Sequence, residues 1–288
     1  DNLHINWYPG HMKKTKEMVQ NNLKLVDVVI ELLDARIPLS SKNPEIDKLA
    51  QNKPRVVVLN KSDLSDKAKL NKWISYYQSK GIKAIPVDTL KGNGVNKIVE
   101  ECKNATKEKM DALKEKGRKE RAIRVMIVGV PNVGKSSLIN KLTGRKSTQT
   151  GDRPGVTKGK QWVRLKGNLE LLDTPGILWP KFEDQKIALN LAFTRAIKDE
   201  ILDIDTLGLK FIEKMSEIEP EKLKARYKLD SLGEEPLETM EMIGRKRGFI
   251  LGRNELDYTR IAKTVLNEFR EGKLGQITLE VPEDIEEA

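Results

Sequence analysis

Residues 124–139 read RVMIVGVPNVGKSSLI, and this stretch decides the fold. The mainly apolar residues 124–128 are typical of a buried strand, and Leu138, Ile139 and Leu142 have the spacing of an amphipathic helix. Between them, residues 129–136 fit the pattern G-x-x-x-x-G-K-[ST]. In such a loop, backbone N–H groups surround phosphates, the lysine reaches the β- and γ-oxygens, and the hydroxyl binds Mg²⁺. We therefore predict a phosphate-binding loop between a strand and a helix.

The rest of the front half alternates strand-like and helix-like segments. Short β-branched runs predict strands, which occupy residues 27–33, 55–59, 84–87, 124–128, 161–165 and 169–172. Helix-like stretches lie at 11–23, 65–79 and 96–116. Lys166-Gly167-Asn168 reads as a hairpin turn. We expect an α/β, doubly wound domain over residues 1–182.

The spacing of apolar residues changes after Trp179-Pro180: strand patterns end there and helical spacing begins. The clearest helix covers residues 258–269, and Asn254 with Asp257 three residues later is predicted to cap its start. We expect residues 183–288 to form a small all-α domain, with an acidic, frayed tail at 280–288.

The charge, cysteine and histidine content and the lack of long apolar runs exclude several classes of protein. The formal net charge is +10, divided as +17 over residues 1–182 and −7 over residues 183–288. The basic front half fits a polyanionic partner such as nucleic acid. A single cysteine, Cys102, and two histidines, His4 and His11, exclude an internal disulfide and a Cys/His zinc cluster. No apolar run approaches the ~20 residues of a membrane span, and no signal peptide is evident, so we expect a cytoplasmic protein without a membrane partner.

Asn60-Lys61-Ser62-Asp63 follows a predicted strand and fits N-K-x-D. The Asp63 carboxylate only accepts hydrogen bonds, and guanine offers N1–H and N2–H₂ there, whereas adenine offers a lone pair and no amine. Asn60 is expected to bond the other edge of the base, and the Lys61 stem to cover its face. Val87-Asp88-Thr89 follows the next strand and is a candidate second base-contact loop.

Asp173-Thr174-Pro175-Gly176 ends the strand at 169–172. We expect Asp173 to hold Mg²⁺ through water and the Gly176 N–H to contact the γ-phosphate. Thr157 lies in a polar, glycine-rich stretch and is the candidate switch threonine that joins the metal, with Thr148 and Thr150 as alternatives.

Together these motifs resemble the translation-factor class of GTPases in an altered order. The base motifs at 60–63 and 87–89 precede the phosphate loop, which is the order of circularly permuted GTPases. Three further motifs are similar to the bacterial ribosome biogenesis GTPase A family: Trp7-Tyr8-Pro9-Gly10-His11-Met12, Asp34-Ala35-Arg36-Ile37-Pro38 and Gly176-Ile177-Leu178-Trp179-Pro180.

The resemblance implies a GTPase that binds an immature large ribosomal subunit, both rRNA and ribosomal proteins, and acts late in its maturation. It also implies GTP or GDP with Mg²⁺ as ligands, an RNA-binding C-terminal domain, and a monomer away from the ribosome. The alternative is a nucleotide-sensing rRNA-binding module in which hydrolysis is incidental. The cluster Arg245-Lys246-Arg247 with Arg253 suits phosphate contact or, equally, a solvated helix end.

Many GTPases position the attacking water with a glutamine directly after D-x-x-G, but here that residue is Ile177. Three replacements stay open: His11, which the family resemblance supports; a potassium ion at Asn132; and a group supplied by the ribosome. The predicted catalytic set is His11, Lys135, Thr157 and Gly176, and the predicted metal ligands are Ser136, Thr157 and Asp173, with Asn132 for K⁺. The predicted nucleotide contacts are Asn60, Lys61, Ser62, Asp63, Asp88, Thr89, Asn132, Val133, Gly134, Lys135, Ser136, Ser137 and Gly176.

Overall fold

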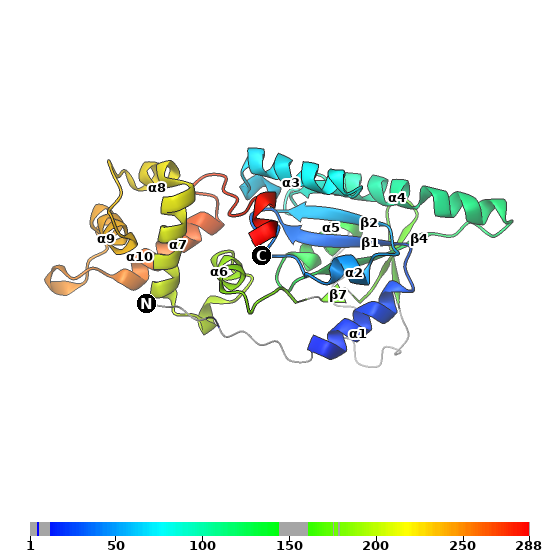
Figure 1. Ribbon diagram of the computed structural model, residues 1–288, viewed down its shortest axis with the longest axis horizontal. Helices are drawn as coiled ribbons and strands as arrows, with labels where there is room; N and C mark the ends of the chain where they lie inside the picture. Colours follow the sequence, from blue (N-terminus) through cyan, green and yellow to red (C-terminus); the bar gives the residue numbers. More distant parts are fainter. Residues whose placement is uncertain (1–4, 6–11, 144–160, 175, 178, 288) are drawn as a thin grey trace. The chain divides into compact units, whose positions relative to one another are not determined.

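The computed structural model describes residue 5 and residues 12–143, 161–174, 176–177 and 179–287 (Figure 1). Contacts among them divide the chain into two compact units. The sheet unit contains the described residues between 12 and 181, together with residues 280–287. The helical unit contains Phe182–Leu279 and Ile5. Within the described residues, no helix is both long enough and apolar enough to cross a membrane.

The sheet has the order β3-β2-β1-β4-β6-β5, with β7 paired to β4. All its pairs are parallel except the β5–β6 hairpin. The strands are β1 (Val28–Asp34), β2 (Arg55–Asn60), β3 (Lys83–Val87), β4 (Ile123–Gly129), β5 (Trp162–Leu165), β6 (Leu169–Leu172) and β7 (Gly176–Ile177). Each of the six predicted strands is present, which confirms the predicted α/β class.

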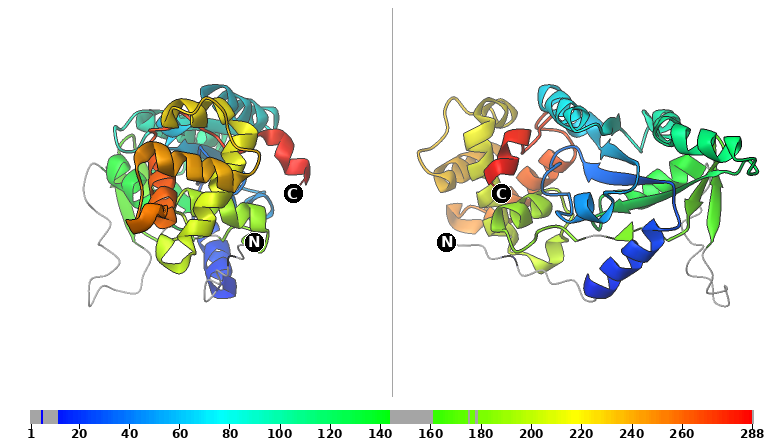
Figure 2. Two further views of the ribbon diagram at one scale, coloured as in Figure 1. Left: turned by 90° about the vertical axis from the view of Figure 1, so that its left-hand side faces the viewer. Right: turned by 45° about the vertical axis from the view of Figure 1, so that its right-hand side comes forward.

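Helices cover both faces of this sheet (Figures 1 and 2). They are α1 (Met12–Leu23), α2 (Ile46–Leu49), α3 (Lys67–Ser79), α4 (Val95–Glu115) and α5 (Lys135–Thr143). Side chains of β1 alternate between the two faces: Ile30 and Leu32 pack with α4 and α5, whereas Val29 packs with α1 and Leu33 with α3. Every residue of β1 is therefore buried, as the continuous apolar run predicts.

The helical unit contains α6 (Gln185–Phe193), α7 (Ile204–Ile218), α8 (Pro220–Tyr227), α9 (Pro236–Arg247) and α10 (Tyr258–Arg270). Its core includes Phe211, whose ring centroid lies 5.3 Å from that of Phe193 and 4.8 Å from that of Phe269. The predicted cap of α10 is corrected in one respect. The Asp257 carboxylate accepts the hydrogen bond from Arg260 N (3.1 Å), while Asn254 lies upstream in a left-handed turn (φ 61°).

The acidic end of the chain does not fray, so this expectation was wrong. Residues 280–287, which we call the return segment, leave the helical unit and pack in the sheet unit, where Pro282–Glu287 form a 3₁₀ turn. Glu280 is only 6% exposed. The predicted domains 1–182 and 183–288 thus differ from the two compact units in Ile5 and Phe182, which belong to the helical unit, and also in these last residues. Without them, residues 183–279 carry a net charge of −2 rather than −7.

Candidate functional site

The sequence motifs meet at the carboxyl edge of the parallel strands. β1 lies between β2 and β4, with Asp34 beside Asn60 in register and Leu32 beside Gly129. The Asn-Lys-Ser-Asp motif leaves β2, and the phosphate loop leaves β4. The two loops therefore lie on either side of β1, which is where doubly wound sheets bind their ligands.

The phosphate loop connects β4 to α5 through two left-handed residues, Asn132 (φ 62°) and Gly134 (φ 104°). Lys135 begins α5, and its Nζ donates to the carbonyl oxygens of Gly129 (3.2 Å) and Val130 (3.1 Å). Burial lowers the pKa of Lys135 to about 8. Ser136 and Asn132 are exposed. A partly buried amine that donates to neutral carbonyl oxygens gains from an anionic partner, so the loop fits a phosphate.

Asn60 connects the two loops directly. Its Nδ2 donates to the Val133 carbonyl oxygen (3.1 Å), and the side chain is almost fully buried. A Cβ atom at Gly134 would lie 2.4 Å from this Nδ2, so only glycine permits the approach. The Asn60 Oδ1 is buried and has no hydrogen-bond partner in the described part of the chain. A buried polar atom without a partner at this edge suits a polar ligand.

The remainder of the base motif forms a tight turn. Lys61 is left-handed (φ 59°) and precedes the 3₁₀ turn η1 (Ser62–Leu64), which Ser65 stabilises by donating from Oγ to the Ser62 carbonyl oxygen (2.7 Å). The Asp63 side chain is exposed, as a group that recognises a base must be. Burial lowers the pKa of Lys61, and the nearby Asp34 opposes that shift.

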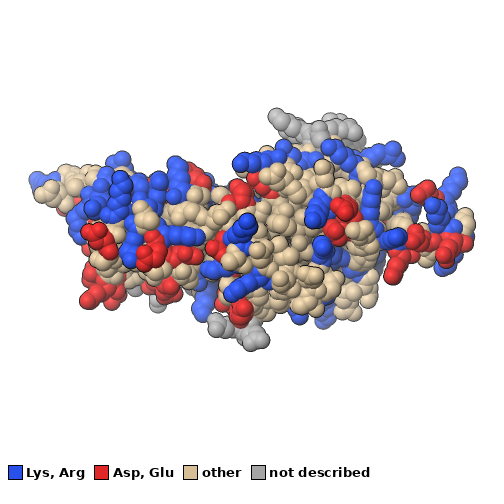
Figure 3. Space-filling model, turned by 90° about the horizontal axis from the view of Figure 1, so that it is seen from above, with Lys and Arg blue, Asp and Glu red and all other residues tan. Residues whose placement is uncertain are grey.

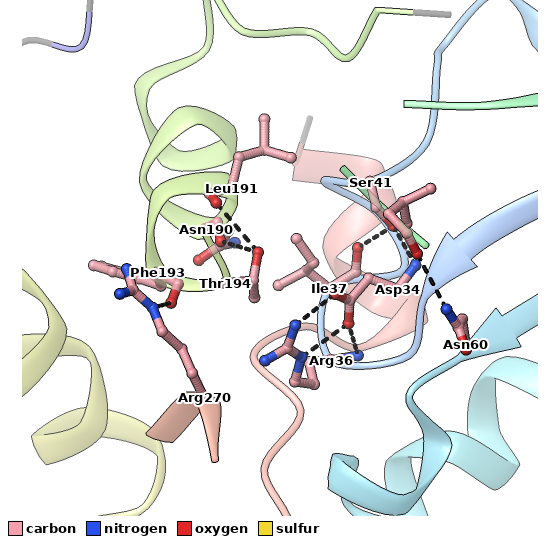
Figure 4. Close-up of polar contacts among 11 residues, drawn as sticks. Asp34, Arg36, Ile37, Ser41, Asn60, Asn190, Leu191, Phe193, Thr194 and Arg270 are labelled. Carbon is pink, nitrogen blue, oxygen red and sulfur yellow. Dashed lines mark hydrogen bonds and ion pairs between the residues drawn. The ribbon is translucent and has the colours of Figure 1, made fainter. Parts of the chain in front are cut away.

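Asp34 and Arg36 are site residues to which the sequence reasoning gave no role. The Asp34 carboxylate accepts from Arg36 N (2.9 Å), Nε (3.0 Å) and Nη2 (2.8 Å), and Figure 4 shows the two groups facing each other near Asn60. Burial raises the pKa of Asp34, but the Arg36 charge and hydrogen bonds outweigh it, so the pKa is lowered. The sequence carries only a weak signal for this pair: Asp34 is a carboxylate at the end of a fully buried strand, two residues before an arginine.

The second predicted base loop follows β3. Asp88 and Thr89 are both buried, and the Asp88 carboxylate accepts from the backbone N–H groups of Leu90 (3.1 Å) and Lys91 (3.3 Å). Asp88 therefore stabilises its own turn. The predicted contacts of Asp88 and Thr89 with a base remain predictions.

The Asp-Thr-Pro-Gly motif lies beside the phosphate loop. Asp173 directly follows β6, and its N–H donates to the Gln161 carbonyl oxygen (2.8 Å). Gly176 begins β7 and pairs with Val128 of β4, one residue before the loop starts. A Cβ atom at Gly176 would lie 2.7 Å from Val128 Cγ1 and 2.8 Å from Met126 Cε. This glycine therefore allows β7 to approach β4 closely.

Two predicted residues, His11 and Thr157, lie outside the described residues. Of the predicted magnesium ligands, Ser136 and Asp173 are described, and both are hard oxygen donors at the same sheet edge. Across the described chain, no group of three or more His, Cys, Asp or Glu side chains is placed to bind a metal by itself. The donors present thus fit an ion that takes its remaining ligands from water and phosphate.

Comparison with known proteins gives a consistent picture. A family model described as 50S ribosome-binding GTPase matches residues 124–237, which hold the phosphate loop but not the earlier base motif. Ribosome biogenesis GTPase A of Bacillus cereus is 50% identical over 98% of this chain and 96% of its own length. The Priestia megaterium protein of the same name is 47% identical over 98% and 99%. The crystal structure of GNP-bound YlqF from T. maritima shares 28% identity with a TM-score of 0.64, covering 94% of this chain and 99% of that one.

Proposed function

This chain belongs to the ribosome biogenesis GTPase A family, and we propose that it binds immature large ribosomal subunits and couples GTP hydrolysis to their late maturation and to its own release. Membership of this family makes the protein a GTPase of ribosome biogenesis. One observation carries the nucleotide assignment: Asn60 of the base motif donates to Val133 of the phosphate loop. The two motifs, far apart in the sequence, thus make one continuous surface for a guanine nucleotide.

We assign guanine recognition to Asp63, with Asn60 and Lys61 at the other edge and face of the base. The second Nδ2 hydrogen of Asn60 is the donor that suits the N7 side of guanine. The Asp34–Arg36 ion pair sets the charge around Lys61, since Asp34 favours its charged form and Arg36 disfavours it. Selectivity arises because adenine would leave the Asp63 carboxylate without a donor.

We assign phosphate binding to the backbone of residues 132–137 and to Lys135. Ser136 and Thr157 would hold Mg²⁺ directly and Asp173 through water; when bound, the ion neutralises charge on the β- and γ-phosphates. Lys135 adds a second positive charge there, and the Gly176 N–H contacts the γ-phosphate. Because Ile177 offers no polar atom, the attacking water is positioned by His11, by a K⁺ ion at Asn132, or by a ribosomal group.

The partner we propose is a large ribosomal subunit in the cytoplasm, bound by a monomer. Arg245, Lys246 and Arg253 of the helical unit are exposed and available to rRNA phosphates. Arg247 is engaged internally: it pairs with Glu268 (3.3 Å) and lies over the Tyr227 ring (5.0 Å). In Figure 3, most Lys and Arg side chains of the helical unit lie toward one edge of the visible face, and most Asp and Glu toward the other. Such separation allows a nearly neutral unit to bind a polyanion.

Co-sedimentation tests the proposal. The chain is mixed with mature or immature large subunits in the presence of GDP or a non-hydrolysable GTP analogue. We expect it to pellet with immature particles and the analogue, and to stay in the supernatant with GDP. Equal binding to both particles, or binding that does not depend on the nucleotide, would contradict the proposal.

A second function, a nucleotide-sensing rRNA-binding module with incidental hydrolysis, is favoured by Ile177, because no polar side chain replaces the usual glutamine there. GTP hydrolysis rates with and without immature subunits distinguish the two. Strong stimulation by the particle supports the timed switch, whereas nucleotide-dependent binding with an unchanged, slow rate supports the module.

A further inference from the structure

The return segment places one buried carboxylate against the loop that follows β1. Glu280 Oε1 accepts from the backbone N–H groups of Leu39 (3.0 Å) and Ser40 (2.9 Å), and its Oε2 accepts from Ser40 Oγ (2.5 Å). The Glu280 carbonyl oxygen accepts from Trp73 Nε1 (3.0 Å). Ser40 is fully buried, so removing the carboxylate would leave its N–H and hydroxyl without this partner at a place away from bulk solvent.

The same loop is connected by further hydrogen bonds to the end of β1. Ser41 Oγ accepts from Asp34 N (2.9 Å) and donates to the Ile37 carbonyl oxygen (2.8 Å), as Figure 4 shows for these labelled residues. Ala35 N donates to the Asn60 carbonyl oxygen (2.8 Å). The loop at residues 35–41 is thus hydrogen-bonded to Glu280 at one end and to the base motif at the other.

The base motif depends on this loop for its electrostatic surroundings as well. The charges of Asp34 and Arg36 have opposite effects on the pKa of the neighbouring Lys61 amine: Asp34 raises it and Arg36 lowers it. A shift of the loop would move both charges relative to Lys61, and would move the Asn60 backbone through Ala35. Small displacements of groups that contact a ligand have large effects on binding.

We propose that Glu280 is a positioning residue for guanine-nucleotide binding: it fixes the loop at 35–41, which in turn fixes Asn60 and Lys61. This inference rests on the proposed assignment of Asn60–Asp63 to the base. Glu280 directly follows Leu279, the last residue of the helical unit. The peptide bond between Leu279 and Glu280 therefore joins the helical unit to a residue whose side chain is hydrogen-bonded to the loop at 35–41.

The test measures the dissociation rate of fluorescent GDP and the kcat and KM of GTP hydrolysis in three variants. Glu280→Ala removes all three acceptor bonds; we expect dissociation to accelerate roughly tenfold or more and KM to rise, with kcat little changed. Glu280→Gln keeps an acceptor oxygen for both backbone N–H groups and should stay within about threefold of the original chain. Glu283→Ala, an exposed change on the same segment, should have no effect.

Thermal unfolding is followed in parallel. Lower thermal stability of Glu280→Ala with an unchanged dissociation rate and KM would mean that Glu280 is only structural, and would overturn the inference. If Glu280→Ala does not fold, Glu280→Met, which keeps the side-chain volume but has no oxygen to accept from the two N–H groups, decides in its place, and an unaltered dissociation rate there has the same meaning.

A separate variant distinguishes this failure from failure of the proposed function. Asp63→Asn tests the base assignment independently of the loop. If Asp63→Asn changes base preference while Glu280→Ala changes nothing, only the inference fails. If Asp63→Asn leaves base preference unchanged, the base assignment itself is wrong.

Discussion

At the scale of single residues, Asn60 and Gly134 decide how the base and phosphate loops meet. The 3.1 Å hydrogen bond from Asn60 Nδ2 requires that residue 134 have no Cβ atom. Asp63, in contrast, is exposed and belongs to a 3₁₀ turn that needs no base to form. Recognition by Asp63 can therefore be altered without changing the connection between the loops.

Base selectivity is expected to depend on Asp63. In Asp63→Asn an amide donor faces the N1–H and N2–H₂ donors of guanine, whereas xanthine offers a carbonyl oxygen in place of the amine. We expect GTP affinity to fall by on the order of 10²-fold or more and xanthosine triphosphate affinity to rise. Competition titration against both nucleotides measures this. An unchanged preference would contradict the assignment, and Asp66→Asn, at the cap of α3 in the same loop region, is the matched control.

We expect nucleotide binding to be coupled to protonation of the Lys135 amine. Its pKa is about 8 because the group is buried, so at pH 8 about half of the ligand-free molecules carry a neutral amine. Phosphate favours the charged form and raises this pKa. Binding of GDP should therefore take up roughly half a proton at pH 8 and about a tenth at pH 7. Calorimetric titration in two buffers of different ionisation enthalpy gives the uptake; a value near zero at pH 8 would refute the linkage.

At the scale of elements, one carboxylate joins α4, β1 and β4 at the edge of the sheet opposite the site. Asp27, directly before β1, accepts from Lys109 Nζ on α4 (2.6 Å), from Arg121 Nη1 (2.7 Å) and Nη2 (2.8 Å), and from Arg124 N of β4 (2.9 Å). Burial raises the pKa of Asp27, but the hydrogen bonds from Arg121 and Lys109 outweigh it and lower the pKa to about 2.

This shift makes stability depend on pH. Because the folded-state pKa of Asp27 lies below the unfolded value of 3.8, its contribution is complete above about pH 5 and is lost as pH falls toward 2. We expect about 2 kcal/mol from it. Urea unfolding of Asp27→Asn should show lower stability at pH 7 and a smaller loss between pH 4 and 2. Asp111→Asn, an exposed change on α4, should follow the original chain; identical pH profiles for all three proteins would contradict the assignment.

The elements show which parts of the fold were predictable. Strands such as β1 were evident because burial on both faces imposes a continuous apolar run, and the hairpin was evident because Gly167 and Asn168 tolerate positive φ (76° and 65°). β7 was not predicted, since two residues carry no periodicity and pair only because β4 lies beside them.

The candidate site divides in the same way. Its motifs could be predicted from the sequence because binding phosphate and guanine requires particular residue types at a constant spacing. The contact of Asn60 with Val133, the Asp34–Arg36 pair and the place of Glu280 depend on tertiary neighbours 73, 2 and 240 residues apart, respectively. Only the second is short enough to be read locally, and an Asp two residues before an Arg is by itself too common a pattern to indicate a buried pair.

At the scale of the whole molecule, we expect GTP hydrolysis to depend on the ribosomal partner. Among the three candidates for positioning the attacking water, His11 would act when the ribosomal particle brings it to the γ-phosphate. We expect His11→Ala to lower kcat about 10²-fold or more on saturating immature subunits, with little change in KM. The free protein should change less. Single-turnover hydrolysis with potassium present measures both; a rate on the particle equal to that of the original chain would leave the cation at Asn132 or a ribosomal group as the catalyst.

The position of Glu280 also has a consequence in time. It is joined to the chain 240 residues after Ser40, the residue it contacts. At about 5–20 residues per second, a ribosome needs on the order of ten seconds or more to add the residues between them. A growing polypeptide can pair β1 through β6 long before that, and during this interval the loop at 35–41 has no Glu280 to bind. If Glu280 positions the base motif, the nascent chain releases guanine nucleotides quickly until synthesis of the helical unit is finished. The order of synthesis would then delay tight nucleotide binding until both units exist.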